Sequence, residues 1–218
     1  MSQNEQKRQN TALTNNNHII VGASGSGKSA FLRKKIDFKQ NRIVAWDADE
    51  DFRLPRIRSM AIFERLAKKQ GFGQIRCAVT VEPTEENFER FCQIVFAIAH
   101  CKAPITIICE EIADVTRVSK ASPHWGQLCR KIRKYGGTIY AVTQRPEEAD
   151  KTIFNQAKFK WCGALGSAAA YKKMAAEMDI SVPELRNLQN IEKKQIEYWL
   201  KEGTQAAQKA KISFMRRR

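Results

Sequence analysis

The sequence lacks the cysteine patterns that mark disulfide frameworks and zinc sites. Its six cysteines form no C-x-x-C pair, and no histidine stands at zinc-finger spacing. Several cysteines lie within apolar runs, where a thiol usually acts as a small buried hydrophobic group. We therefore expect a reduced, cytosolic protein without disulfides. His18, His100 and His124 are far apart in the sequence, form no metal pattern and receive no functional role.

Long hydrophobic segments are also missing. Residues 1–17 are polar and contain no apolar run, so they do not resemble a signal peptide. The most apolar stretch, residues 94–108, is interrupted by His100, Lys102 and Pro104 and is too short to span a bilayer. These absences argue against secreted and membrane-spanning proteins.

Acidic residues are scarce relative to basic ones. The 218 residues include 38 Lys and Arg against 23 Asp and Glu, a formal net charge of +15. Such an excess of positive charge indicates a polyanionic partner, either nucleic acid or an anionic membrane surface. Mean hydropathy is −0.50 and 43% of the residues are hydrophobic, enough for the core of one globular domain. The basic clusters are Arg53, Arg56 and Arg58; Lys68 and Lys69; and Arg216, Arg217 and Arg218.

Apolar runs typical of buried strands alternate with helical patterns along the chain. Strands are expected at 18–22, 42–47, 74–81, 104–109, 138–143 and 158–165, with an edge strand at 195–200. Helices are expected at 30–36, 59–70, 84–101, 122–135 and 167–178. This alternation predicts an α/β fold with a mainly parallel sheet, helices on both of its faces, and ligands at the carboxyl ends of the strands. The domain over 18–202 would follow a flexible arm, 1–17, and precede a basic tail, 203–218.

The tryptophans are expected to serve packing. Trp46, Trp161 and Trp199 lie in strand-like runs, which favours positions in the core or an interface. Trp125 begins a helix after Pro123 and is expected to be partly exposed.

A phosphate-binding pattern is the clearest functional signal. Residues 22–29 match G-x-x-x-x-G-K-[ST] between a buried strand and a helix. Glycines allow the backbone N–H groups to wrap around phosphate oxygens, and the next helix presents its N-terminus to the same anion. We expect Lys28 to reach the β- and γ-phosphates and Ser29 to ligate Mg²⁺. The predicted nucleotide contacts are Gly22, Ala23, Ser24, Gly25, Ser26, Gly27, Lys28, Ser29 and Ala30.

Polar residues at the ends of other strands complete the predicted site. Glu110 and Glu111 follow an apolar strand, and we assign Glu110 to Mg²⁺ and Glu111 to the attacking water. An assignment shifted by one residue stays open, because many P-loop enzymes have Asp where Glu110 stands. Gln144 ends the strand at 138–143, where it either contacts the γ-phosphate or water or is structural. Asp47 ends another strand on the same rim, where it either joins the site or caps a helix.

Three segments together resemble the HerA–FtsK class of DNA-pumping ATPases, and the Glu-Glu pair is similar to the HerA branch. They are residues 22–29, residues 107–111 and residues 133–146, which run from Arg-x-x-Gly to a strand ending in Thr-Gln-Arg-Pro. The resemblance covers residues 18–170 and implies a three-layer RecA-like ATPase motor domain. It also implies a hexameric ring with double-stranded DNA in its channel and ATP at subunit boundaries. Gln144 would be the polar sensor, and Arg133, with Arg130 as the alternative, would act in trans on a neighbour's nucleotide.

The chain has room for little beyond the motor core, so it looks like the small genome-packaging ATPases of tectivirus- and corticovirus-type phages. That resemblance implies ATP- and Mg²⁺-dependent packaging of double-stranded DNA into a preformed capsid. It places the protein in the host cytoplasm or at the packaging vertex, beside capsid or viral membrane proteins. Two other functions stay open. One is a small-molecule or nucleoside kinase, which leaves the charge and the Gln-Arg-Pro segment unexplained, and the other is an assembly protein that uses nucleotide as a switch. A GTPase is disfavoured because the sequence has no Asn-Lys-x-Asp segment.

Overall fold

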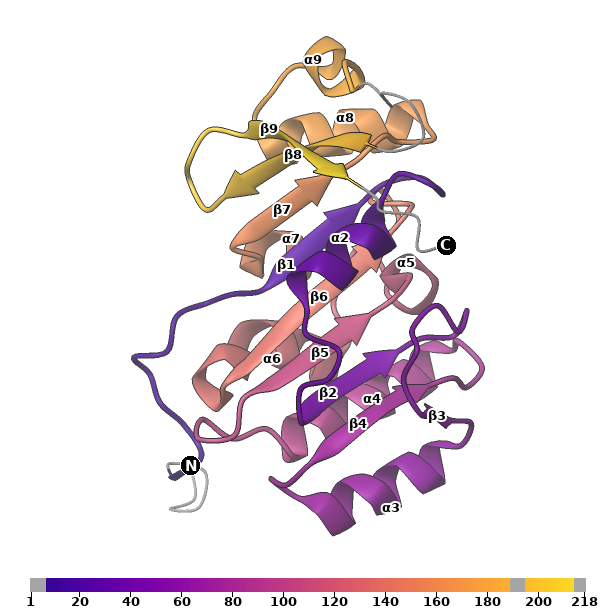
Figure 1. Ribbon diagram of the computed structural model, residues 1–218, viewed down its shortest axis with the longest axis vertical. Helices are drawn as coiled ribbons and strands as arrows, with labels where there is room; N and C mark the ends of the chain where they lie inside the picture. The colour runs from indigo at the N-terminus through magenta and orange to yellow at the C-terminus, as the bar shows by residue number, and fades with distance from the viewer. Residues whose placement is uncertain (1–6, 189–194, 214–218) are drawn as a thin grey trace.

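The computed structural model describes residues 7–188 and 195–213, which form one nine-stranded sheet with surrounding helices (Figure 1). The strand order is β3-β4-β2-β5-β6-β1-β7-β8-β9. Neighbours from β3 through β7 are parallel, whereas β8 is antiparallel to both β7 and β9. The strands are β1 (His18–Val21), β2 (Arg42–Trp46), β3 (Arg56–Ile57), β4 (Ile75–Val79), β5 (Ile105–Cys109), β6 (Gly137–Thr143), β7 (Phe159–Cys162), β8 (Gln195–Glu202) and β9 (Gln208–Ser213).

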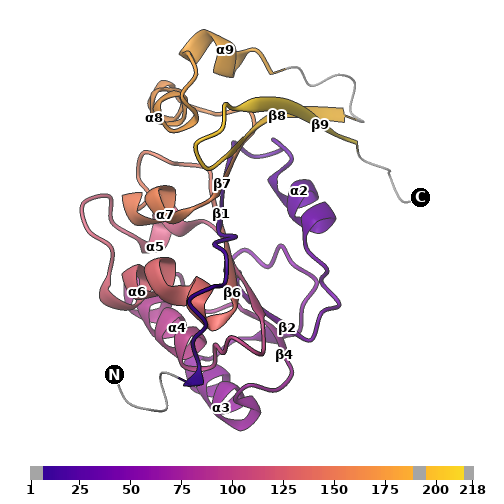
Figure 2. The same ribbon diagram turned by 90° about the vertical axis from the view of Figure 1, so that its left-hand side faces the viewer.

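The helices are distributed unevenly over the two faces of the sheet. Figure 2 shows α3, α4, α6 and α7 on one face, and α2 on the other. The predicted mainly parallel α/β fold is confirmed, and its helical cover is thick on one side and thin on the other. The helices are α2 (Lys28–Lys35), α3 (Met60–Gln70), α4 (Glu85–Ala97), α5 (Ile112–Val115), α6 (Pro123–Lys131), the 3₁₀ helix η1 (Ile132–Tyr135), α7 (Lys151–Gln156), α8 (Ala168–Met178) and α9 (Val182–Arg186).

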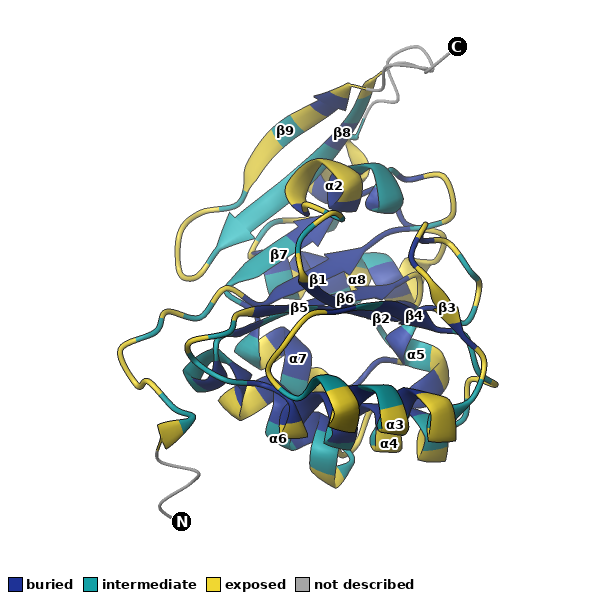
Figure 3. Ribbon diagram, turned by 60° about the horizontal axis from the view of Figure 1, so that its bottom comes forward, coloured by how far each residue is buried: buried dark blue, intermediate teal, exposed yellow. Residues whose placement is uncertain are grey.

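Two hydrophobic clusters hold these layers together. The larger lies between the sheet and α3, α4, α6 and α8, and the smaller lies between the sheet and α2 (Figure 3). The central strands carry apolar side chains on both faces, as in Ile19-Ile20-Val21, because both faces of a parallel sheet are covered. All six cysteines are free thiols, as expected. No helix of the described residues is long and apolar enough to cross a membrane.

The predictions for the tryptophans are confirmed at every position except one. Trp46 and Trp161 are buried, and Trp199 packs partly buried against the core. The expectation that Trp125 is partly exposed was wrong, since its side chain is fully buried. Its indole Nε1 donates a hydrogen bond of 3.1 Å to a carboxylate oxygen of Asp150. That bond removes the cost of burying the N–H group, so the ring can fill the core beside Phe88.

The N-terminal segment also differs from the expected flexible arm over its described residues. The Arg8 guanidinium donates to the carbonyl oxygens of Phe96 and Ala99 at the end of α4. Asn17 is buried, and its side-chain oxygen accepts a hydrogen bond of 3.0 Å from the Ile139 N–H group of β6. The polar side chains that suggested disorder instead form hydrogen bonds with backbone groups at the end of α4 and in β6.

The opposite end of the chain shows a second difference. Residues 208–213, within the expected basic tail, form β9 and pair with β8. Ala210 and Ile212 alternate with Lys209 and Lys211 along this strand, and Ile212 is buried in the smaller cluster. Period-two alternation is the signature of a strand with one covered face, but the high lysine content obscured it.

His18 gives the fold a predicted pH dependence. Its ring is buried between Tyr140 and Phe159, with ring centroids 4.4 and 4.5 Å away, and burial lowers its pKa to about 4. The unfolded chain binds a proton near pH 6.5, so the contribution of His18 to stability should fall as the pH drops from 6.5 toward 4, by up to about 3 kcal/mol. Urea unfolding at several pH values should show the wild type and the control His124→Gln losing this stability relative to His18→Phe as the pH falls. An equal loss in His18→Phe would contradict the prediction.

Candidate nucleotide-binding site

The glycine-rich loop, residues 22–29, leaves the end of β1 between the ends of β6 and β7. Gly22 donates its N–H to the Thr143 carbonyl of β6 over 3.2 Å, and Ala23 donates to the Ala164 carbonyl beyond β7 over 2.7 Å. The loop is thus fixed to both neighbouring strand ends. This placement at the carboxyl end of the sheet is the one expected for a ligand site in an α/β fold.

The glycines are required by the shape of the loop. Gly25 and Gly27 have φ values of 75° and 98°, in the left-handed region that disfavours side chains. A Cβ on Gly22 would collide with the Ser26 side chain, and one on Gly27 would approach Ile196 of β8 to 3.2 Å. The loop is therefore wound tightly, with little room between it and β8.

Lys28 and Ser26 are the polar groups inside this loop. The Lys28 ammonium donates to the carbonyls of Gly22, at 2.7 Å, and Ala23, at 3.1 Å. Burial lowers the pKa of Lys28, while Glu110 and Glu111 act in the opposite direction. The Ser26 hydroxyl is buried and has no hydrogen-bond partner in the described structure. Nucleotide phosphates fit here, because they offer acceptors to both groups next to the N-terminus of α2.

Glu110 is a buried carboxylate that faces the same region. Only 8% of the residue is exposed, and its Oε2 atom has no hydrogen-bond partner among the described residues. Burial raises its pKa to about 8; the nearby Asp51 adds to the rise and Lys28 opposes it. No group of three or more His, Cys, Asp or Glu side chains in the described ranges is arranged to hold a metal. The donors present fit Mg²⁺, which proteins commonly bind through one or two carboxylates together with substrate phosphates.

Glu111 turns toward β6. Its backbone is left-handed, with φ 42° and ψ 59°, at the N-cap of α5. Its Oε1 atom accepts hydrogen bonds from the Thr143 hydroxyl over 2.8 Å and from the Gln144 N–H over 3.1 Å. The Gln144 side chain is exposed at the rim of the sheet. The structure therefore brings Glu110, Glu111, Gln144 and the glycine-rich loop to adjacent strand ends.

Thr143 was missed in the sequence analysis. It is a polar residue at the last position of the otherwise apolar run Tyr140-Ala141-Val142, directly before Gln144. That position was the available signal, because side chains at the carboxyl ends of central strands face the site.

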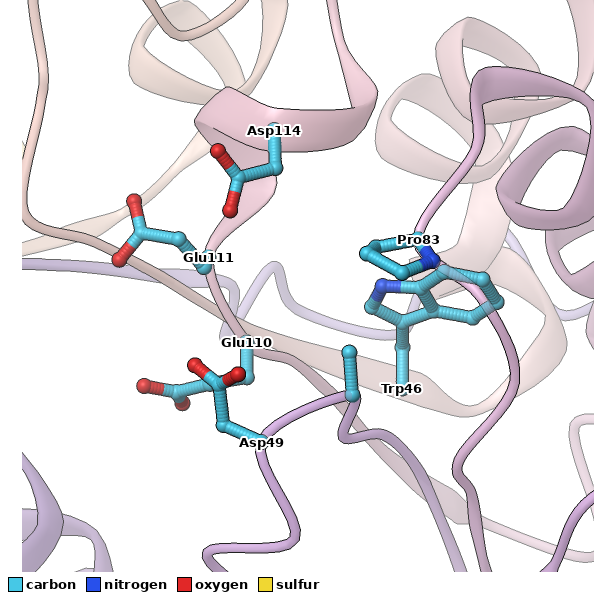
Figure 4. A pocket seen from close by; sticks show the side chains of 7 residues that line it. Trp46, Asp49, Pro83, Glu110, Glu111 and Asp114 are labelled. Atoms are coloured by element: carbon cyan, nitrogen blue, oxygen red, sulfur yellow. The ribbon is translucent and has the colours of Figure 1, made fainter.

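An acidic pocket extends the site beyond Glu110 and Glu111. Figure 4 shows acidic side chains on one side and Trp46 and Pro83 on the other. Asp49 and Asp114, which the sequence analysis did not single out, also line it. Asp47 is fully buried and accepts the backbone N–H groups of Asp51 and Phe52, so it shapes the turn after β2.

Arg133 lies away from these groups. It belongs to η1, which precedes β6, so it stands at the amino edge of the sheet and the glycine-rich loop at the carboxyl edge. Its guanidinium donates to the carbonyls of Thr11 at 3.2 Å and Leu13 at 2.7 Å. Arg130, at the end of α6, precedes the same edge. Neither arginine joins the site within one subunit.

Comparison with known proteins places this arrangement in a family. No protein-family model matches the sequence. The chain is 60% identical over 208 residues to "Protein P9" of Pseudoalteromonas phage PM2, with 95% of each chain covered. The chain belongs to the Protein P9 family. This relative is a phage protein, which agrees with the resemblance to phage proteins that the motifs and the size of the chain indicated.

The fold of this P9-family chain is similar to that of solved P-loop NTPases. The genome packaging NTPase B204 from Sulfolobus turreted icosahedral virus 2, in complex with AMP, matches with a TM-score of 0.70 at 12% identity. That match covers 92% of this chain and 98% of B204. The cytoplasmic domain of the type VII secretion ATPase EccC of Thermomonospora curvata matches with a TM-score of 0.54 at 14% identity, over 90% of this chain and 25% of EccC.

Proposed function

We propose that this P9-family protein is an ATP-driven motor that moves double-stranded DNA and packages a viral genome into a preformed capsid. The observation that carries the proposal is the convergence of Lys28, Glu110 and Glu111 at adjacent strand ends. Its fold is that of a genome packaging NTPase that has been solved with an ATP analogue, AMPPCP. The motor would act in the host cytoplasm and at the packaging vertex, beside capsid or viral membrane proteins.

Each residue of the proposed site has a separate task. The loop N–H groups and Lys28 bind the phosphates and stabilise charge on the transferring phosphoryl group. Ser29 and Glu110 would hold Mg²⁺, which neutralises phosphate charge when bound. Glu111 accepts a proton from the attacking water, and Gln144 orients that water or the γ-phosphate.

The two edges of the sheet carry opposite charge. Among the described residues, the last helical turns and the loops that lead into β1, β2, β4, β5, β6 and β7 have one acid, Asp37, and form what we call the basic edge. The loops and first helical turns that follow these strands form the acidic edge, where acids outnumber basic residues. Basic residues of the basic edge are Lys7, Arg8, Arg33, Lys34, Lys35, Lys39, Lys68, Lys69, Lys102, Arg130, Lys131, Arg133, Lys134 and Lys158. Acidic residues of the acidic edge are Asp47, Asp49, Glu50, Asp51, Glu82, Glu85, Glu86, Glu110, Glu111, Asp114, Glu147, Glu148 and Asp150.

This difference in charge between the two edges supports a head-to-tail ring. If the basic edge of one copy faces the acidic edge of the next, opposite charges meet around a closed assembly. Arg133 would then lie toward the neighbour's nucleotide. Within its own subunit, Arg133 is too far from the glycine-rich loop to contact the nucleotide. We propose a hexamer with ATP at each boundary and Arg133 acting in trans.

Basic residues outside the ring interface would bind the phosphates of the DNA. Arg56 and Arg58 share one partner, Glu50, and Lys68 shares Glu64 with Arg90, so these parts of the predicted clusters are only partly neutralised. Arg216, Arg217 and Arg218 lie outside the described residues. The net charge of +15 still favours sequence-independent contact with duplex phosphates, and such contact weakens steeply with salt.

The proposal predicts ATP hydrolysis that depends on DNA. Steady-state turnover with Mg²⁺ should rise with long linear duplex DNA, fall across a salt series and vanish in Lys28→Ala. Turnover that does not change with DNA but requires a small phosphate acceptor would instead indicate that the protein is a kinase. Tight nucleotide binding without turnover would favour the nucleotide-switch function.

A further inference from the structure

Thr143 occupies a bridging position in the site. Its strand, β6, lies between β5, which leads to Glu111, and β1, which leads to the glycine-rich loop. The Thr143 carbonyl accepts the Gly22 N–H over 3.2 Å, while its hydroxyl lies 2.8 Å from Glu111 Oε1. One residue therefore contacts both the first glycine of the loop and the carboxylate assigned to the water.

The direction of the hydroxyl bond follows from its other partner. The Thr143 hydroxyl oxygen also accepts the Arg145 N–H over 3.1 Å. A hydroxyl has a single proton, and a carboxylate can only accept, so the proton points at Glu111. Arg145 is itself held by ion pairs with Asp114 and Glu148, which fixes the chain segment that carries these donors.

Glu111 needs such a bond to point toward the loop. Its left-handed backbone is unfavourable for a residue with a side chain and persists only where contacts hold it. Glu111 itself lines the pocket together with Asp49, Glu110 and Asp114, where like charge repels its carboxylate. The bonds from Thr143 and Gln144 instead direct it across the end of β6, toward β1.

We infer that Thr143 is a positioning residue that orients the Glu111 carboxylate toward the nucleotide through its hydroxyl group. This inference rests on the proposed function. Thr143 is completely buried at the end of an apolar strand, where valine would fill the same volume. Packing therefore accounts for the size of the Thr143 side chain but gives no reason for its hydroxyl group.

Comparing Thr143→Val with Thr143→Ser distinguishes the effect of the hydroxyl group on activity from the effect of side-chain packing. In Thr143→Val, kcat for ATP hydrolysis should fall about 10- to 100-fold, because a small misplacement of a reacting group is costly. KM and the affinity for ADP should stay within about twofold, since the loop is intact. Thr143→Ser should recover most of kcat. Thr138→Val, at the far end of β6, is the matched control and should behave as wild type.

Two outcomes would overturn the inference. Turnover in Thr143→Val at or above the wild-type rate would show that the bond does not position Glu111 for the reaction. Equal losses in Thr143→Ser and Thr143→Val would show that the hydroxyl is not responsible. The double variant Thr143→Val/Glu111→Gln should lose no more than Glu111→Gln alone, because both changes remove one function. Full turnover in Glu111→Gln would instead contradict the proposed role of Glu111, independently of Thr143.

Discussion

Glu111→Gln is expected to reduce ATP turnover about 1000-fold, within the 10²- to 10⁴-fold range of general-base loss, while nucleotide still binds. The amide keeps the size of the side chain and its acceptor oxygen toward Thr143, but it cannot take a proton from water. Lys28, Ser29 and the loop backbone are unchanged, so ATP affinity should remain. Single-turnover hydrolysis together with equilibrium binding of a fluorescent ATP analogue would measure both effects.

Glu86→Gln is the matched control for this change. Glu86 is exposed in the first turn of α4, on the same acidic edge, and makes no ion pair within the described residues. Its turnover should match the wild type, which would exclude a general effect of removing one negative charge. If Glu111→Gln keeps more than about a tenth of the wild-type rate, another group must act as the base. Glu110 would be the next candidate, as the sequence analysis left open.

Arg133→Ala should lower DNA-stimulated turnover about 1000-fold, as expected for loss of an arginine that stabilises phosphoryl transfer in trans. Its contacts with Thr11 and Leu13 are backbone carbonyl contacts at the amino edge, so the glycine-rich loop of the same subunit is not disturbed. Lys172→Ala, at an exposed position of α8 outside the basic edge, should keep full turnover. Arg130→Ala tests the alternative arginine.

Mixing two inactive variants tests the trans role directly. A Lys28→Ala subunit has no working loop but still offers Arg133, and an Arg133→Ala subunit has the opposite defect. In a head-to-tail ring, up to about a quarter of the boundaries in an equal mixture would combine an intact loop with an intact arginine. Turnover should therefore reappear on mixing. Continued inactivity of a mixture that forms rings would contradict the proposed trans contact.

Local patterns were enough to predict the central part of the site. The glycine-rich loop is a contiguous segment whose backbone needs glycine at particular positions, so its residues identify it without the rest of the chain. The pair Glu110-Glu111 directly follows an apolar strand, and a parallel sheet places such strand ends on one edge. The alternation of strand and helix patterns predicted the fold class, and the strand order brought these two segments together.

Predictions that depended on a distant partner were less successful. Trp125 was expected to be partly exposed because a helix start is usually open to solvent, but Asp150 accepts its N–H and allows burial. The asparagines of the arm looked like a disordered composition, yet Asn17 bonds to β6 more than a hundred residues away. The hydrogen-bond partners of Trp125 and Asn17 lie far from them in the sequence, so the neighbouring residues do not reveal these partners.

By itself, the sequence determined the α/β fold class, the wound glycine-rich loop and the strand that ends in two glutamates. These features follow from nearest neighbours: hydrophobic periodicity, glycine conformation and residue order along one segment. Only the tertiary structure decided that Thr143 lies between Glu111 and Gly22, that β9 extends the sheet, and that Arg133 faces away from its own loop. Those facts depend on which strands become neighbours, and strand order is set by packing of the whole chain rather than by any one segment.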